Sequence, residues 1–249
     1  MNNEQYPEDN LISFAVSMQK IYKHIFFDLD RTLWDFDASA AEAFSKIYEK
    51  FDLKKRGVAS FEKFKQYYTL HNEFLWSLYR EGKLEKEVLR GLRFRKTLEE
   101  FGIKDDALAE KIGDYYVEIS PLLVHLFPNA IEILEYLHPK YELHIITNGF
   151  SEVQFTKLKV SGMEKYFREI ITSEEAGVKK PDPLIFSYAF NRTKAKAGAS
   201  LMIGDDAEVD IAGARQIGMD QVLFDPSGKS LKNGATYYVN NLSELKNIL

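Results

Sequence analysis

The chain has 249 residues and no cysteine, and its formal net charge is −5. This length allows one large domain or a core with a smaller partner domain. The lack of cysteine excludes disulfides, thiolate nucleophiles and cysteine-based metal sites. The acidic balance, with Lys and Arg dispersed along the chain, argues against binding to a nucleic-acid polymer.

Residues 1–20 are predicted to form a tail that precedes the folded core. The apolar run Leu11–Met18 follows the acids Glu4, Glu8 and Asp9 and no Lys or Arg, whereas a secretory signal carries positive charge at that place. No run in the sequence reaches the roughly 20 apolar residues that span a bilayer. We therefore expect a cytoplasmic protein without a membrane partner.

The first predicted strand, Ile25–Phe27, is an apolar run that stops at a carboxylate, which is typical of a buried strand leaving a sheet. Side chains two apart in an extended chain project to the same side, so Asp28 and Asp30 both face the region beyond the strand's carboxyl end. Open parallel sheets bind their ligands at this edge. Alternatively, the two acids belong to a solvated loop in which Thr32 caps a turn.

A long helical stretch follows, from about Asp35 to about Leu122. Side chains on one face recur there at spacings of three and four, for example at Phe64, Tyr68, His71, Leu75 and Leu78. No strand-like run interrupts the pattern. We predict four amphipathic helices, Ala38–Phe51, Phe61–Tyr79, Lys83–Phe101 and Asp105–Ile119.

From Phe127 onward, strand patterns alternate with helix patterns, which predicts a parallel sheet with right-handed crossovers. The expected fold class is α/β, a doubly wound, Rossmann-like parallel sheet core with an inserted all-α cap domain. The core would comprise residues 21–34 and 123–249, and the cap residues 35–122. The predicted strands are Glu142–Thr147, Glu169–Thr172, Ser200–Gly204, Gln221–Phe224 and Thr236–Val239. The predicted helices are Asn129–Leu137, Ser151–Lys159, Pro183–Phe190, Ala207–Ile217 and Leu242–Leu249.

Thr147 and Asn148 end the second predicted strand. An Asn-Gly pair there is also a hairpin signal, but a helical pattern follows it in this chain. A Thr hydroxyl and adjacent backbone amides at a strand-to-helix turn form a natural phosphate cradle. We therefore consider Thr147 and Asn148 candidate phosphate-binding residues.

Lys180 precedes Pro181, which forces it toward an extended conformation, and Pro183 suits the first turn of a helix. The neighbouring Lys179 is interpreted as a solvated surface residue. Lys180 is the better candidate for a site.

A fourth apolar strand pattern runs into the acids Asp205, Asp206, Glu208 and Asp210. Acids at a helix start stabilise its N-terminal dipole, which is a sufficient explanation for Glu208. An EF-hand loop is excluded, because alternate ligand positions would fall on apolar residues and no central Gly is present.

These four segments together resemble the four ordered motifs of the haloacid dehalogenase (HAD) superfamily, most of whose members are Mg²⁺-dependent phosphatases. The motifs are Asp28-Leu-Asp-Arg-Thr32, Thr147-Asn148, Lys180-Pro181 and Gly204-Asp-Asp-Ala-Glu-Val-Asp210. Arg31 departs from the pattern, because relatives often carry Gly or Asp there, and Asp206 stands where Ser or Asn is frequent. The sequences Phe26–Trp34 and Ile146–Phe150, together with the helical cap, look most like the branch of noncanonical pyrimidine 5′-nucleotidases.

The resemblance implies a role for each motif residue. Asp28 would be the nucleophile and Asp30 the general acid and base, and Lys180 would offset charge on Asp28 and on the phosphoryl group. Thr147 and Asn148 would bind phosphate. Mg²⁺ would be held by Asp28, the backbone carbonyl of Asp30 and Asp205, with Asp210 as a supporting acid. The expected partner is a small-molecule phosphate ester, and the protein is expected to be a monomer or homodimer.

Three other functions compete with this prediction. Phosphoglycolate or sugar-phosphate hydrolysis would differ only in the cap. Dehalogenation of a 2-haloacid needs neither Mg²⁺ nor the second acid, so Asp30 and Asp205 argue against it. A phospho-accepting signalling module would place its acidic pair on the first strand and its acceptor Asp on a later one, in a domain about half this length. In this chain Asp28 and Asp30 come first, the acidic cluster comes last, and a large insertion covers the site, so the order argues against a signalling module.

Overall fold

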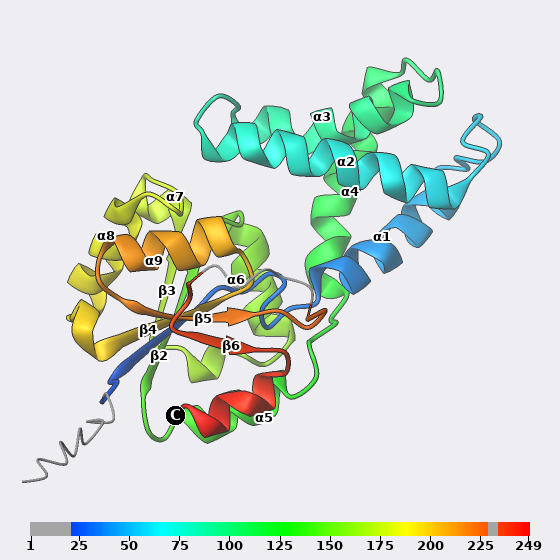
Figure 1. Ribbon diagram of the computed structural model, residues 1–249. Coiled ribbons are helices and arrows are strands. Elements are labelled where there is room, and N and C mark those ends of the chain that lie inside the picture. The colour runs from blue at the N-terminus through cyan, green and yellow to red at the C-terminus, as the bar shows by residue number, and fades with distance from the viewer. Residues whose placement is uncertain (1–20, 229–233) are drawn as a thin grey trace, which may run out of the picture.

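A computed structural model of the protein describes residues 21–228 and 234–249. The predicted tail at residues 1–20 lies outside the described part. Within the described residues, six parallel strands form one sheet in the order β3-β2-β1-β4-β5-β6 (Figure 1). The strands are β1 (His24–Phe27), β2 (Glu142–Thr147), β3 (Glu169–Thr172), β4 (Ser200–Gly204), β5 (Asp220–Phe224) and β6 (Tyr237–Val239).

The strand order changes direction beside β1. The chain proceeds from β1 outward through β2 to β3, then returns to β4 on the other side of β1 and continues to β5 and β6. The carboxyl ends of β1 and β4 therefore flank a topological switch point, where open α/β sheets bind ligands. Asp28 follows β1 at this point, and its backbone N–H donates to the Ile203 carbonyl of β4 at 2.9 Å.

Both faces of the sheet are covered, as the continuous apolar strand runs require. On one face, Ile25 and Phe27 belong to a core that includes α5 (Ala130–Leu137) and the 3₁₀ helix η5 (Leu242–Asn247). On the other face, Phe26 packs in a core that includes α8 (Pro183–Thr193) and α9 (Ala212–Gln216). Consecutive β1 side chains thus support opposite layers. Four further helical elements belong to the described core: α6 (Ser151–Val160), η2 (Glu164–Tyr166), α7 (Ser173–Ala176) and η3 (Ala197–Ala199).

A helical block lies between β1 and α5 and stands beside the sheet (Figure 1). Its hydrophobic core is separate from the two sheet cores, and it includes Phe44, Phe64 and Phe94. The side chains of Asp35, Ser60 and Asp105 accept hydrogen bonds from backbone N–H groups and cap three of the helices. The block contains α1 (Phe36–Lys50), α2 (Phe61–Arg80), α3 (Lys86–Glu99), α4 (Asp106–Ile119) and η1 (Ser120–Leu122).

The predicted fold class, an α/β doubly wound core with an inserted helical cap, is confirmed. Two segments differ in detail from the prediction. The predicted helix Ala207–Ile217 begins as a π-helical turn, η4 (Ala207–Ile211), before α9, and the predicted C-terminal helix is the 3₁₀ helix η5. The wider π turn places the carboxylate of Asp210 back against Gly204, where an added Cβ would overlap with that carboxylate. Among the described helices, none has the length and apolarity needed to cross a membrane.

Candidate active site

A buried lysine joins two carboxylates at the carboxyl edge of the sheet. The Lys180 ammonium donates to Asp28 Oδ1 at 2.5 Å and to Asp210 Oδ1 at 2.6 Å. Lys180 is 1% exposed and Asp28 is 8% exposed, so these are ion pairs in a largely dry environment. Buried charges require such pairing. The three side chains come from the residue after β1, the loop before α8 and the π turn after β4, so only the folded sheet edge brings them together.

The acids at this edge outnumber the lysine. Carboxylate oxygens of Asp28, Asp205 and Asp210 all lie within 4.8 Å of one another. Burial raises the pKa of Asp28 to about 7, although Lys180 opposes the shift. Burial, together with the charges of Asp210 and Asp28, raises the pKa of Asp205 well above its ordinary range. The cluster therefore holds more negative charge than the chain itself neutralises.

Loop contacts hold Lys180 in place. Burial alone would lower the pKa of its ammonium, but the charges of Asp210 and Asp28 outweigh burial and raise it. The Asn148 side chain accepts from the Lys180 backbone N–H at 2.8 Å and donates to the Lys180 carbonyl at 2.9 Å. The Asn148 amide thus braces the lysine loop. The Thr147 hydroxyl, also at this edge, accepts from the Gly149 backbone N–H at 3.0 Å.

Asp30 is held by two side chains that the sequence did not single out. Gln154 Nε2 donates to Asp30 Oδ2 at 2.8 Å, and the Lys157 ammonium pairs with Asp30 Oδ1. Both belong to α6 and both are at least 97% buried. Polar residues three apart on the buried side of this helix, next to the buried Leu158, were the signal available in the sequence.

The two unusual motif positions have structural roles. Arg31 adopts a left-handed φ of 61° and forms an ion pair with Asp37 at 2.9 Å at the start of the helical block. Asp206 caps the π turn, because its side chain accepts from the backbone N–H groups of Glu208 and Val209. Thr32 Oγ1 donates to Asp205 Oδ1 at 3.4 Å, so this hydroxyl faces the acid cluster.

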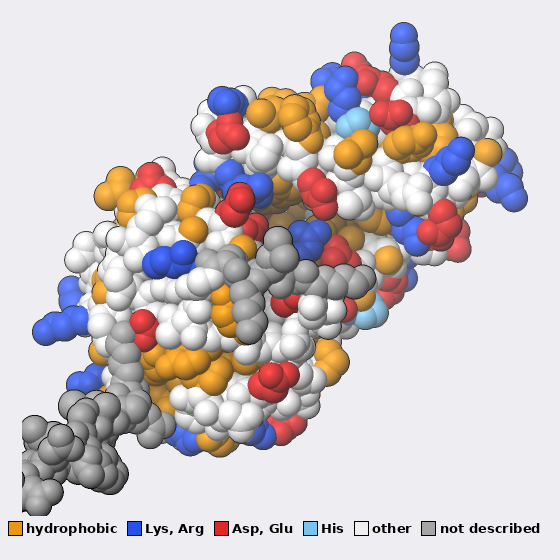
Figure 2. Space-filling view, in the orientation of Figure 1, with side chains coloured by type: hydrophobic (Ala, Val, Ile, Leu, Met, Phe, Trp, Pro, Cys, Tyr) orange, Lys and Arg blue, Asp and Glu red, His pale blue; other side chains and the backbone are white. Residues whose placement is uncertain are grey.

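A cleft of about 340 Å³ opens over these groups. Its floor includes Asp28, Asp205 and Lys180, and α2 of the helical block contributes Asn72 and Trp76 to its walls. Figure 2 shows the hollow between the core and the helical block. A small molecule bound there would contact both parts of the chain.

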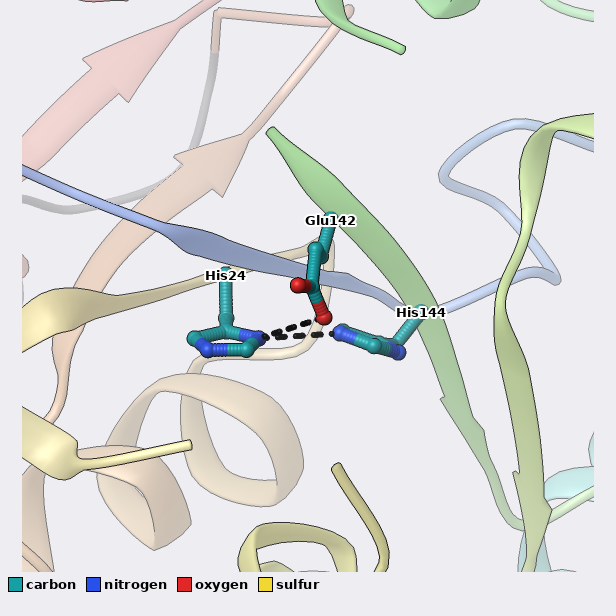
Figure 3. Close-up of side chains that lie close together, drawn as sticks. All are labelled: His24, Glu142 and His144. Atoms are coloured by element: carbon teal, nitrogen blue, oxygen red, sulfur yellow. Dashed lines mark hydrogen bonds and ion pairs between the residues drawn. The ribbon is translucent and has the colours of Figure 1, made fainter. Parts of the chain in front are cut away.

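A second group of possible metal ligands lies at the opposite, amino end of β1 and β2 (Figure 3). His24 Nδ1 and His144 Nε2 are 3.2 Å apart, and His24 Nδ1 is 3.6 Å from Glu142 Oε2. Burial lowers the pKa of His144 to about 3 and also lowers that of His24, so both rings are neutral and share one hydrogen bond. Arg168 pairs with the Glu142 carboxylate at 2.6 Å. The chain thus balances the charge of the Glu142 carboxylate itself, while His144 Nδ1 is buried without a hydrogen-bond partner among the described residues.

The geometry at the carboxyl edge agrees with the family to which the chain belongs. Residues 25–224 match the family of haloacid dehalogenase-like hydrolases, so the protein is a member of that family. A crystal structure of the HAD-hydrolase YfnB of Bacillus subtilis bound to magnesium superposes with a TM-score of 0.85 and 30% identity, covering 92% of this chain and 99% of that one.

Curated relatives include a protein named as a HAD-hydrolase and two named for nucleotidase or phosphatase activity. The YfnB sequence is 31% identical over 92% of this chain and 96% of YfnB. The pyrimidine 5′-nucleotidase YjjG of Escherichia coli is 32% identical over 90% of this chain and 96% of YjjG. The ribulose-1,5-bisphosphate 5-phosphatase of Halopiger xanaduensis is also 32% identical, over 83% of this chain and 86% of that protein. The chain is thus an enzyme of the phosphatase-containing HAD hydrolases, as predicted.

Proposed function

We propose that the protein is a Mg²⁺-dependent phosphomonoester hydrolase that acts through an aspartyl-phosphate on Asp28, with pyrimidine nucleoside 5′-monophosphates as substrates. The observation that carries the proposal is the excess of buried carboxylate around Asp28 and Lys180 at the switch point of the sheet. A phosphate dianion would be repelled by these carboxylates, so a cation must bind with it to offset the negative charge.

The acid cluster fits a magnesium ion. Mg²⁺ prefers carboxylate and carbonyl oxygens, and the raised pKa values of Asp28 and Asp205 indicate that the chain's own cations do not fully offset the burial and mutual repulsion of these acids. Asp28, Asp205 and the backbone carbonyl of Asp30 would hold the ion, while Asp210 remains paired with Lys180. When bound, Mg²⁺ would neutralise charge between the carboxylates and the phosphate oxygens.

The chain's own residues would divide the reaction into two steps. Lys180 occupies Asp28 Oδ1, which leaves Oδ2 to attack phosphorus while the bond to the leaving oxygen breaks. Asp30 would donate a proton to that leaving oxygen and then accept one from the water that hydrolyses the aspartyl-phosphate. Gln154 and Lys157 would fix the orientation of Asp30 during both transfers. The Thr147 hydroxyl and neighbouring amides would bind the phosphate oxygens, and Lys180 would offset their charge.

The roofed cleft supports a small phosphate ester as substrate. We propose that residues 35–122 act as a lid over the core, because α2 side chains wall the cleft above Asp28. The similarity to YjjG favours pyrimidine nucleotides. A sugar-phosphate substrate is the second candidate, because the relative named for ribulose-1,5-bisphosphate is also 32% identical, over a smaller share of the chain.

A substrate panel tests this proposal. The purified protein would be assayed for phosphate release from UMP, dUMP, dTMP, AMP, phosphoglycolate and sugar phosphates, with Mg²⁺ and with EDTA. We expect metal-dependent release with the highest kcat/KM on pyrimidine monophosphates. Preference for a sugar phosphate would keep the chemistry and change the substrate. The absence of release from every ester would refute the proposal and reopen the dehalogenase and signalling alternatives.

A further inference from the structure

A second, smaller cavity of about 50 Å³ adjoins the cleft, between α6 and the helical block. It shares Asp30, Phe36, Trp76 and Gly149 with the cleft, so the two spaces meet beside Asp30. Its volume exceeds that of one water site but is too small for a nucleoside. It therefore suits the polar edge of a group whose remainder lies in the cleft.

Arg93 of α3 lines this cavity and is only 3% exposed. Its Nη1 donates to the Tyr68 hydroxyl at 3.0 Å and to Asn72 Oδ1 at 3.2 Å, and both partners are neutral. The Tyr116 ring lies 5.4 Å from the guanidinium. Among the described residues, no carboxylate lies within ion-pair distance of Arg93. A buried guanidinium without an anionic partner is costly unless a ligand supplies acceptor oxygens.

Three side chains of the cavity's lining leave a buried polar atom without a hydrogen-bond partner in the described part of the chain. These atoms are Arg93 Nε, Trp34 Nε1 and Gln154 Oε1. Gln154 Nε2 donates to the Asp30 carboxylate, which would repel the amide oxygen at that place. The amide oxygen Oε1 is therefore the Gln154 atom without a partner. Two are donors and one is an acceptor. Since buried polar groups are normally paired, their gathering around one cavity indicates a polar ligand.

We infer that this cavity is a specificity subsite for a leaving group that carries a carbonyl oxygen beside an N–H. The inference rests on the proposed function and deepens it. Arg93 and Trp34 would donate to carbonyl oxygen, and Gln154 would accept from the N–H. A carboxylate would accept hydrogen bonds from both donors, but it has no hydrogen to donate to Gln154 Oε1 and would be repelled by that oxygen. The Lys157 ammonium, which lines the same cavity, is already paired with Asp30.

The matched pair of variants is Arg93→Met and Arg95→Met. Arg95 lies two residues further along α3, its side chain is 43% exposed, and its contact with Asp106 is 4.0 Å long. Steady-state kinetics would be measured with Mg²⁺ on UMP, on ribose 5-phosphate, which lacks the base, and on phosphoglycolate, which offers a carboxylate. We expect Arg93→Met to lower kcat/KM on UMP by about 10- to 100-fold. The loss on ribose 5-phosphate should be smaller by a factor of about ten, and Arg95→Met should behave as wild type.

A second variant keeps the inference testable if Arg93→Met does not fold, as judged by its thermal melt. Trp34→Phe removes the Nε1 donor and keeps an aromatic ring, and we expect it to lower kcat/KM on UMP by about 3- to 10-fold, with a smaller loss on ribose 5-phosphate. Equal losses on both substrates would overturn the subsite, because they indicate a purely structural role. A greater loss on phosphoglycolate than on UMP would also overturn it, in favour of carboxylate recognition. If the wild type hydrolysed no ester, the proposed function would fail first, and this inference with it.

Discussion

Ionisable side chains gather at both ends of the central strands, at the amino ends of β1 and β2 and at the carboxyl ends of β1 and β4, but the two groups differ in electrostatic balance. At the amino end, His24 shares a hydrogen bond with His144, Glu142 pairs with Arg168, and burial lowers the pKa of both imidazoles. At the carboxyl end, three acids lie together, one lysine pairs with two of them, and burial and neighbouring carboxylates raise the pKa of each acid.

This difference indicates that the carboxyl end, and not the amino end, has an excess of charge that a bound ligand would offset. A cluster that the chain neutralises needs nothing further, whereas a buried excess of one charge is maintained at a cost to stability. Both clusters meet a simple distance criterion for metal binding. Charge balance, and position at the switch point, separate the candidate active site from a structural feature of the sheet.

The largest effect should come from removing the proposed nucleophile. Asp28→Asn keeps the size of the side chain and a partner for Lys180 but cannot form the aspartyl-phosphate, so we expect kcat to fall by at least about a thousandfold. Asp182→Asn is the control, because Asp182 caps α8 and Asn caps helices equally well; its kcat should stay within about twofold of wild type. A variant at Asp28 with parental turnover would remove this residue from the mechanism.

The next effect concerns stability at the carboxyl end without metal. The pKa of Asp28 is about 7 in the folded protein, above its unfolded value, so protonation favours folding. In EDTA, stability from this group is present at acidic pH and is lost as pH rises through about 7. We expect Tm to be several degrees higher near about pH 5.5 than near about pH 7.5.

Two additions sharpen this measurement by differential scanning fluorimetry. Mg²⁺ should raise Tm most at the higher pH, because it binds the ionised acids. Asp28→Asn in EDTA should be less sensitive to pH than wild type, since it lacks one of the raised acids. A Tm in EDTA that rises with pH and does not respond to Mg²⁺ would contradict an excess of buried negative charge at this edge of the sheet.

The smallest effect should come from the amino end. The pKa of His144 is about 3 when folded, below its unfolded value, so its contribution to stability is present above about pH 6.5 and is lost as pH falls. Between about pH 7.5 and pH 5.5, the decrease in the free energy of unfolding should be about 1 kcal/mol smaller for His144→Leu than for wild type. Urea unfolding at both pH values measures this change. Turnover should remain within about twofold of wild type, and a large loss of kcat would show that the two ends are coupled.

The sequence by itself determined the fold class and most of the candidate site. Apolar strand runs that stop at polar residues predicted β2, β3 and β4 with the bounds observed. The ends of the first, second and fourth predicted strands marked Asp28, Thr147 and Asp205, because the carboxyl ends of parallel strands meet at one edge of a sheet. The long helical stretch between the first two strands likewise predicted an insertion over that edge.

Only the tertiary structure decided which polar side chains face one another. Lys157 and Gln154 meet Asp30 from a helix more than 120 positions along the chain, and the Asn148 side chain braces the Lys180 loop. Arg93 in the helical block lies against a cavity that the core completes. Periodicity reports which side of a helix is buried but not what it is buried against. Contacts between the block and the core depend on how two separately packed units dock, and no local pattern encodes that geometry.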